Sequence, residues 1–177
     1  MVTNLKQPTP LANRLLQLVL MALFGALLFV AQVALSWAAN VELVTLLVLL
    51  LAVTYGMRTL ISLYLFVLVE GVYYGISEWF INYLYVWLVP LILGVLFRKQ
   101  TSRWFWAVLS GLYGLAFGTL CSFPKLLIGG VPAMLGYIIS GFSFDVIHAV
   151  SNFLVAFFLF VPLRNVLNDL NRQCRMT

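Results

Sequence analysis

Long apolar stretches alternate with short polar or charged segments along almost the whole chain. A helix needs roughly 20 mostly apolar residues to cross the hydrocarbon layer of a bilayer. The pattern predicts an all-α membrane protein with six transmembrane helices, which are Leu15–Trp37, Val41–Tyr55, Thr59–Tyr74, Phe80–Phe97, Trp104–Ser122 and Phe142–Leu163. The second and third stretches are short, so we expect them to be little tilted, sheltered by neighbours, or fused into a buried hairpin.

The segment between the fifth and sixth predicted helices is apolar but irregular. From Phe123 to Gly141 it contains two prolines and four glycines, which disfavour a regular span. We predict a Gly/Pro-rich outer loop with a short or re-entrant helix, whose backbone must be covered by protein or face water. No repeat, linker or low-complexity tract divides the sequence, so we expect residues 1–177 to form a single membrane domain.

The composition also indicates a bilayer as the main solvent. Of the 177 residues, 64% are hydrophobic and 8% are charged, whereas soluble domains have roughly 45–50% and 25%. The first apolar stretch is too long for the hydrophobic region of a signal peptide, so we expect it to remain as a span.

The basic residues lie between the apolar stretches, where they act as topology signals. If the N-terminus is cytoplasmic, only Lys125 of the ten Lys and Arg residues falls on the outer side. The other nine are Lys6, Arg14, Arg58, Arg98, Lys99, Arg103, Arg164, Arg172 and Arg175. Because Lys and Arg favour cytoplasmic loops, we predict that both termini are cytoplasmic. The basic residues do not form a patch interleaved with aromatic residues, so we expect no nucleic-acid partner.

Motifs for catalysis or metal binding are scarce. The chain has one histidine and contains no HExxH, GxSxG or GxxxxGK[ST] motif. Its two cysteines, Cys121 and Cys174, are predicted to lie on opposite sides of the membrane, so we expect no disulfide. The sequence therefore predicts no catalytic residue, no metal, no cofactor and no ATPase site.

Acidic residues are distributed in the opposite way to basic ones. Four of the five fall in or near the outer half of the predicted bundle, namely Glu42, Glu70, Glu78 and Asp145. Trp37, Asn40 and Glu42 form a first cluster between the first two helices, where a carboxylate and an amide could bind a polar ligand. Alternatively, Asn40 caps the second helix and Glu42 interacts with its positive N-terminal end.

A second cluster covers the end of the third predicted helix, the following turn and the start of the fourth helix. Glu70 lies within an apolar run, where a carboxylate costs about 2.5–3.5 kcal/mol, so it should face a cavity or a partner. Groups that suit a flat ligand with polar edges are provided by Glu78, Trp79, Asn82 and Tyr83. We interpret Tyr85 and Trp87 as aromatic residues of the membrane interface.

A third cluster lies on the sixth predicted helix. Asp145, His148 and Asn152 have the spacing i, i+3, i+7, which places them on one helix face. We interpret this face as the wall of a ligand cavity, and the alternative is a clamp of hydrogen bonds between helices. Lys125, on the outer side, is included with these candidate substrate-binding residues.

Small side chains mark two helix faces where another helix can approach closely. On the fifth helix, a face of this kind is formed by Gly111, Gly114 and Gly118, and we expect it to pack within the bundle. On the first helix, Ala22, Gly25 and Ala26 could pack internally or receive a helix from another subunit.

Taken together, these features resemble the substrate-specific component, or S component, of energy-coupling factor transporters, which import vitamins into bacteria and archaea. The resemblance rests on the chain length, the predicted topology and the Ala22–Ala26 segment, which matches the Ala-x-x-x-Ala motif of the family. Three further segments resemble one subgroup, namely Asn40–Val44, Phe80–Trp87 and Phe144–His148. The link between the first two predicted helices, Ala38–Asn40, is shorter than the substrate lid often present there.

The resemblance implies a multi-pass protein of the bacterial plasma membrane that binds a vitamin or related micronutrient from outside, with cobalamin as the best guess. It also implies docking, through Ala22 and Ala26, on a transmembrane coupling subunit that two cytoplasmic ATPases drive. Two other classes remain open. A small intramembrane enzyme would use Asp145 and His148, and a structural membrane protein would use its polar residues only for packing.

Overall fold

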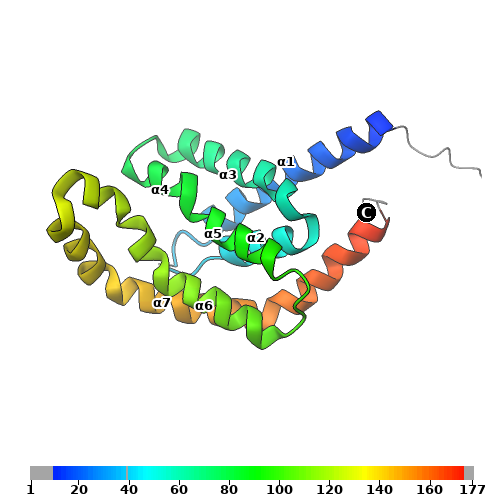
Figure 1. Cartoon of the computed structure of the whole chain (residues 1–177). Coiled ribbons are helices and arrows are strands. Elements are labelled where there is room, and N and C mark those ends of the chain that lie inside the picture. Colours follow the sequence, from blue (N-terminus) through cyan, green and yellow to red (C-terminus); the bar gives the residue numbers. More distant parts are fainter. Residues whose placement is uncertain (1–9, 39, 174–177) are drawn as a thin grey trace, which may run out of the picture.

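A computed structural model describes residues 10–38 and 40–173, and this part of the chain is helical with short connections. Its elements are α1 (Pro10–Ala34), α2 (Val44–Tyr55), the 3-10 turn η1 (Gly56–Arg58), α3 (Thr59–Tyr74), α4 (Glu78–Val86), α5 (Leu88–Leu96), α6 (Arg103–Cys121) and α7 (Phe123–Gln173). The start of α1 and the end of α7 lie at the same end of the molecule (Figure 1). The prediction of an all-helical fold is confirmed.

Five helical stretches among the described residues are long and apolar enough to cross a membrane. They are Asn13–Ala34, Val44–Tyr74, Glu78–Leu96, Arg103–Cys121 and Phe123–Asn171. The second stretch contains two of the predicted spans, α2 and α3, which are separated by η1 and by Gly56 at φ 62°. Long apolar helices of this number are those of a multi-pass membrane protein, whereas six crossings and cytoplasmic termini stay predictions.

The first connection is longer than the sequence indicates. Helix α1 ends at Ala34 and α2 begins at Val44, so residues 35–43 connect them instead of Ala38–Asn40 alone. Main-chain hydrogen bonds from Ser36 to Val33 and from Val41 to Ala38 hold this connection in consecutive turns. The connection therefore carries enough polar residues to form one wall of a cavity.

Tyrosine hydroxyls compensate two prolines in the helices. Pro90 has no N–H to donate to the carbonyl of Val86, four residues earlier, and the Tyr113 hydroxyl donates to that carbonyl at 3.2 Å. In the same way, the carbonyl that Pro124 leaves free, that of Leu120, accepts the Tyr85 hydroxyl at 2.7 Å. These bonds join the α4–α5 unit to α6 and its C-terminal end. Tyr85 was expected at the membrane interface, but the structure shows it bonded within the protein.

The segment from Phe123 to Gly141 is helical, so the loop predicted there is wrong, whereas a short helix was expected and precedes the kink at Gly130. Helix α7 starts at Phe123 and is kinked at Gly130, whose φ of 68° and ψ of −168° are not helical. Pro132 falls in the first turn after this kink, where the missing N–H is tolerated. The glycine and the proline therefore change the direction of the helix without ending it, and α7 then runs back along α6 (Figure 1).

Helices α6 and α7 approach closely along a face of glycines, which confirms the packing predicted for that face. A Cβ atom added at Gly114 would lie 2.8 Å from the carbonyl oxygen of His148, and one at Gly111 would lie 3.2 Å from that of Ala149. At Gly118 the missing side chain makes room for the Asp145 carboxylate. This close approach places the middle of α7, with His148, against the interior.

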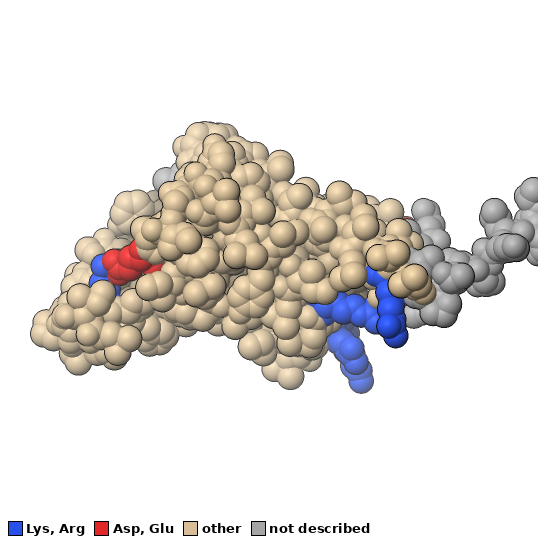
Figure 2. All heavy atoms as spheres, turned by 90° about the horizontal axis from the view of Figure 1, so that it is seen from above, with Lys and Arg blue, Asp and Glu red and all other residues tan. Residues whose placement is uncertain are grey.

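Charged residues separate toward the two ends of the molecule. Figure 2 shows Lys and Arg atoms near the end where α1 begins and α7 finishes, and a small group of acidic and basic atoms at the opposite end. At the first of these ends Arg164 donates to the main-chain oxygens of Arg98 and Gln100, which ties α7 to the α5–α6 connection. Three residues of the sequence-based predictions, Lys6, Cys174 and Arg175, lie outside the described residues.

Candidate ligand cavity

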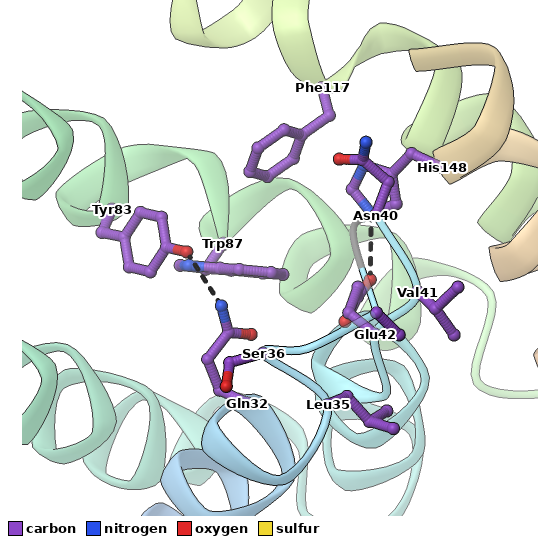
Figure 3. A pocket seen from close by; sticks show the side chains of 11 residues that line it. Gln32, Leu35, Ser36, Asn40, Val41, Glu42, Tyr83, Trp87, Phe117 and His148 are labelled. Carbon is purple, nitrogen blue, oxygen red and sulfur yellow. Dashed lines mark hydrogen bonds and ion pairs between the residues drawn. The ribbon is translucent and has the colours of Figure 1, made fainter. Parts of the chain in front are cut away.

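A cavity of about 290 Å³ lies where the α1–α2 connection meets α4, α6 and α7 (Figure 3). Helix α1 and the connection provide most of its lining, with Gln32, Leu35, Ser36, Ala38, Asn40, Val41 and Glu42. The remaining lining residues come from α4, the α4–α5 junction, α6 and α7, namely Tyr83, Trp87, Phe117 and His148. Pockets for small molecules usually measure about 300–1,000 Å³, so this cavity is at the small end of that range.

Glu42 connects the first helix turn of α2 to the cavity. One carboxylate oxygen, Oε2, accepts the main-chain N–H of Thr45 at 2.8 Å, and Oε1 lies 3.2 Å from Nε2 of His148. Figure 3 shows this contact crossing the cavity wall from the connection to α7. The interaction with the N-terminal end of α2 is therefore present, and ligand binding by Glu42 stays a prediction, with Oε1 on the cavity side.

The surroundings of Glu42 keep its carboxylate ionised. Burial raises its pKa, but the hydrogen bond and the charge interaction with His148, together with the bonds from Thr45, outweigh burial and lower the pKa below its usual 4.5. Glu42 therefore carries a negative charge at neutral pH, in a position where a ligand can reach it.

Asn40 has a left-handed backbone conformation with φ 61°, which asparagine tolerates better than most residues. Its main-chain oxygen accepts the Ser151 hydroxyl at 2.7 Å, and this bond ties the connection to α7. Its side-chain Nδ2 is buried without a hydrogen-bond partner among the described residues. The expected cap on α2 comes from Glu42 instead, so the amide of Asn40 remains available to a ligand.

Three aromatic side chains, Tyr83, Trp87 and Phe117, form another wall of the cavity, called here the aromatic wall. Ring centroids of Tyr83 and Trp87 are 5.5 Å apart, and those of Trp87 and Phe117 are 5.7 Å apart. The amide of Gln32 donates to the Tyr83 hydroxyl at 3.3 Å. Trp87 was expected at the membrane interface, which is wrong, because it is only 2% exposed and its Nε1 has no partner in the described part of the chain.

Four of the predicted substrate-binding residues line this cavity, namely Asn40, Glu42, Tyr83 and His148. Trp79 lies behind the wall, with its ring centroid 5.1 Å from that of Tyr83. Trp37 does not contribute, because it is 82% exposed and its Nε1 donates to the carbonyl of Ala34.

Glu78 and Lys125 lie away from the cavity. Their side chains form an exposed ion pair of 2.8 Å that joins the start of α4 to the start of α7. Such exposed pairs contribute little to stability, since water competes for both charges. The structure therefore separates these two residues from the other predicted site residues.

The remaining polar candidates are buried without lining the cavity. The side chain of Asn82 accepts the Tyr85 hydroxyl at 2.9 Å, and Asp145 accepts the main-chain N–H of Gly118 at 3.0 Å. Asn152 and Glu70 are 1% and 2% exposed, and each has a side-chain atom without a partner among the described residues. The polar residues of α7 thus have different roles, since His148 lines the cavity whereas Asp145 forms a hydrogen bond between α7 and α6.

The small residues of α1 differ in their surroundings, since Gly25 is packed within the protein whereas Ala22 and Ala26 are exposed. A Cβ atom at Gly25 would lie 2.9 Å from the main-chain oxygen of Ser62, so Gly25 lets α1 pack against α3. Gly25 is therefore not free to receive another subunit.

Sequence reasoning missed Gln32, Ser36 and Phe117. Gln32 carried a detectable signal, because an amide within an apolar helix is costly unless it faces a polar partner or a cavity. Ser36 was assigned to the first span, and Phe117 looks like any lipid-facing or core residue. The ring centroids of Phe117 and His148 are 5.0 Å apart, and this contact depends on the packing of α6 against α7.

Chemically, the cavity offers one ionised carboxylate, one imidazole, two amides and a wall of aromatic rings. No group of three or more His, Cys, Asp or Glu residues in the described ranges is placed to hold a metal ion. Comparison with models of known protein families, with curated proteins and with solved structures finds no match.

Proposed function

We propose that this protein is the substrate-binding subunit of an energy-coupling factor type importer, which captures a vitamin-like compound. The observation that carries the proposal is the cavity itself. An ionised Glu42 and the unpartnered Asn40 Nδ2 lie in it with an aromatic wall, which carries a second unpartnered donor, Trp87 Nε1. A protein that used its polar residues only for packing would pair these groups with one another, since unpaired buried donors are costly.

In this proposal the chain crosses the bacterial plasma membrane six times, with both termini in the cytoplasm. The separation of charged residues toward the two ends supports this orientation (Figure 2). Transport requires a transmembrane coupling subunit, which docks on the exposed Ala22 and Ala26, and two cytoplasmic ATPases that drive this subunit.

The volume of the cavity refines the expected ligand. About 290 Å³ suits a compound of one or two rings and favours it over cobalamin, which is a much larger molecule. We therefore propose a small vitamin or vitamin precursor as the substrate.

A ligand screen on the purified protein tests this function. We expect at least one compound from a panel of vitamins and their precursors to raise the thermal unfolding temperature in detergent, because a ligand that binds only the folded state stabilises it. The panel should include anionic, neutral and cationic members. The absence of any stabilising compound would contradict the proposal.

Docking through α1 gives a separate prediction. Changing both Ala22 and Ala26 to leucine should abolish copurification with the coupling subunit and the ATPases, because the larger side chains prevent close helix contact. The unfolding temperature of the isolated protein should not change, since both positions are exposed. Copurification from coexpressing cells, followed by gel densitometry, measures the effect.

Ala116→Leu is the matched control for this experiment. Ala116 is an exposed residue in the middle of α6, on a different helix from the docking motif. This variant should copurify as the wild type does. Normal copurification of the double variant would remove Ala22 and Ala26 from the docking surface.

A further inference from the structure

We propose that the cavity selects a cationic nitrogen heterocycle of one or two rings that also carries a hydrogen-bond acceptor, and that it rejects carboxylates and phosphates. This inference rests on the proposed function and specifies the substrate class of the same cavity.

The charged residues that line the cavity favour a cation over an anion. Glu42 provides a carboxylate, and its low pKa keeps that carboxylate ionised. No Lys or Arg is among the residues that line the cavity in the described structure. Lys125 is held by Glu78 at 2.8 Å, outside the cavity. An anionic ligand would therefore lose its hydration and meet the negative charge of Glu42, and the imidazole of His148 that could offset this charge already contacts Glu42 at 3.2 Å.

Glu42 also has capacity left for a ligand. A carboxylate offers about four lone-pair sites, and the contacts with Thr45 and His148 use two of them. The N–H group of a cationic ligand could occupy a remaining site and form a charge-assisted hydrogen bond, which is roughly twice as strong as a neutral one.

The aromatic wall favours a flat cation. The rings of Tyr83 and Trp87 meet at an interplanar angle of 87°, so they form a corner that can contact both the face and the edge of a ligand ring. Phe117 closes the wall on the side of His148. Aromatic faces attract cations through their quadrupole, and this attraction grows when water is excluded.

Two unpartnered donors define the acceptor on the ligand. Trp87 is only 2% exposed, yet its Nε1 donates to no group in the described residues. The Nδ2 of Asn40 is also buried without a partner among these residues. Figure 3 shows the indole nitrogen of Trp87 turned toward the side where Tyr83 and Gln32 lie. A hydroxyl, carbonyl or ring nitrogen of the ligand would satisfy these donors.

A series of compounds that share a ring but differ in charge tests the inference. Pyridoxamine is cationic, pyridoxine neutral and 4-pyridoxate anionic at pH 7, and thiamine is a cation with two rings. We expect thermal stabilisation and calorimetric binding with pyridoxamine or thiamine, weaker binding with pyridoxine, and none with 4-pyridoxate. Glu42→Gln should weaken binding of the cation by about tenfold, because the variant retains the side-chain shape but loses the charge.

Glu78→Gln is the matched control, since it removes a carboxylate that lies outside the cavity. It should leave the affinity for the cation unchanged. If an anionic or neutral member of the vitamin panel binds and both cations fail, the charge inference is wrong while the proposed function stands. If no panel member binds, both fail. Equal losses in the Glu42 and Glu78 variants would show that Glu42 does not recognise the cation.

Discussion

Changing Gly114 to leucine is expected to lower the free energy of unfolding by about 3 kcal/mol, the upper part of the range for overpacking a close contact. A Cβ atom at this position would lie 2.8 Å from the main-chain oxygen of His148 and 3.0 Å from Cα of Ala149. Because these are main-chain atoms, they cannot move aside unless α6 separates from α7. Thermal or denaturant-induced unfolding in detergent measures the loss.

Gly136→Leu provides the control for this prediction. Gly136 also lies in a helix, α7, but apart from its own chain neighbours and adjacent helix backbone no described atom lies within 4 Å of its added Cβ. Leucine there should leave stability unchanged or raise it by up to about 1 kcal/mol through its higher helix propensity. Equal stability of the Gly114 and Gly136 variants would mean that the α6–α7 contact does not depend on glycine.

The second large effect is expected from two tryptophans that differ in the partner of their ring nitrogen. Trp87→Phe should weaken ligand binding by about tenfold and lower stability less than Trp106→Phe, because Trp87 lines the cavity and its Nε1 has no partner among the described residues. Trp106→Phe should leave ligand affinity unchanged and lower stability by about 1–3 kcal/mol. The reason is that the Nε1 of Trp106 donates to the carbonyl of Gln100 at 3.3 Å, and this hydrogen bond is lost.

The comparison of these two variants separates binding from packing. Both tryptophans are almost fully buried, and Trp106 stacks on Phe160 with a centroid distance of 4.4 Å in a part of the core that does not line the cavity. Isothermal titration with a ligand from the screen gives the affinities, and thermal unfolding gives the stabilities. Similar affinity losses in both variants would show that Trp87 acts through the core instead of contacting the ligand.

Part of the candidate site could be predicted from the sequence. Glu42 and His148 could be recognised because an ionisable residue near or within apolar helices needs a partner or a cavity. Glu78 and Lys125 were grouped with them because they share a predicted side of the membrane. Their ion pair depends on the start of α7 reaching the start of α4, and the helical course of α7 was not predicted.

The compensation of two prolines could not be predicted from the local sequence. Pro90 and Pro124 each leave a carbonyl without its helical partner. Tyr113 and Tyr85 supply the missing donors from 27 and 35 residues away in sequence. A hydroxyl at that separation becomes a partner only after the helices have packed.

The sequence alone determined that this chain folds into apolar helices, because long hydrophobic stretches can bury their main-chain polar groups in a bilayer only as helices or closed barrels. It also placed α3 at Thr59–Tyr74, in agreement with the structure. The tertiary structure decided which polar side chains face a cavity and which bind one another. Glu42 and His148 are 106 residues apart in sequence, and their contact exists only because α7 packs beside the α1–α2 connection.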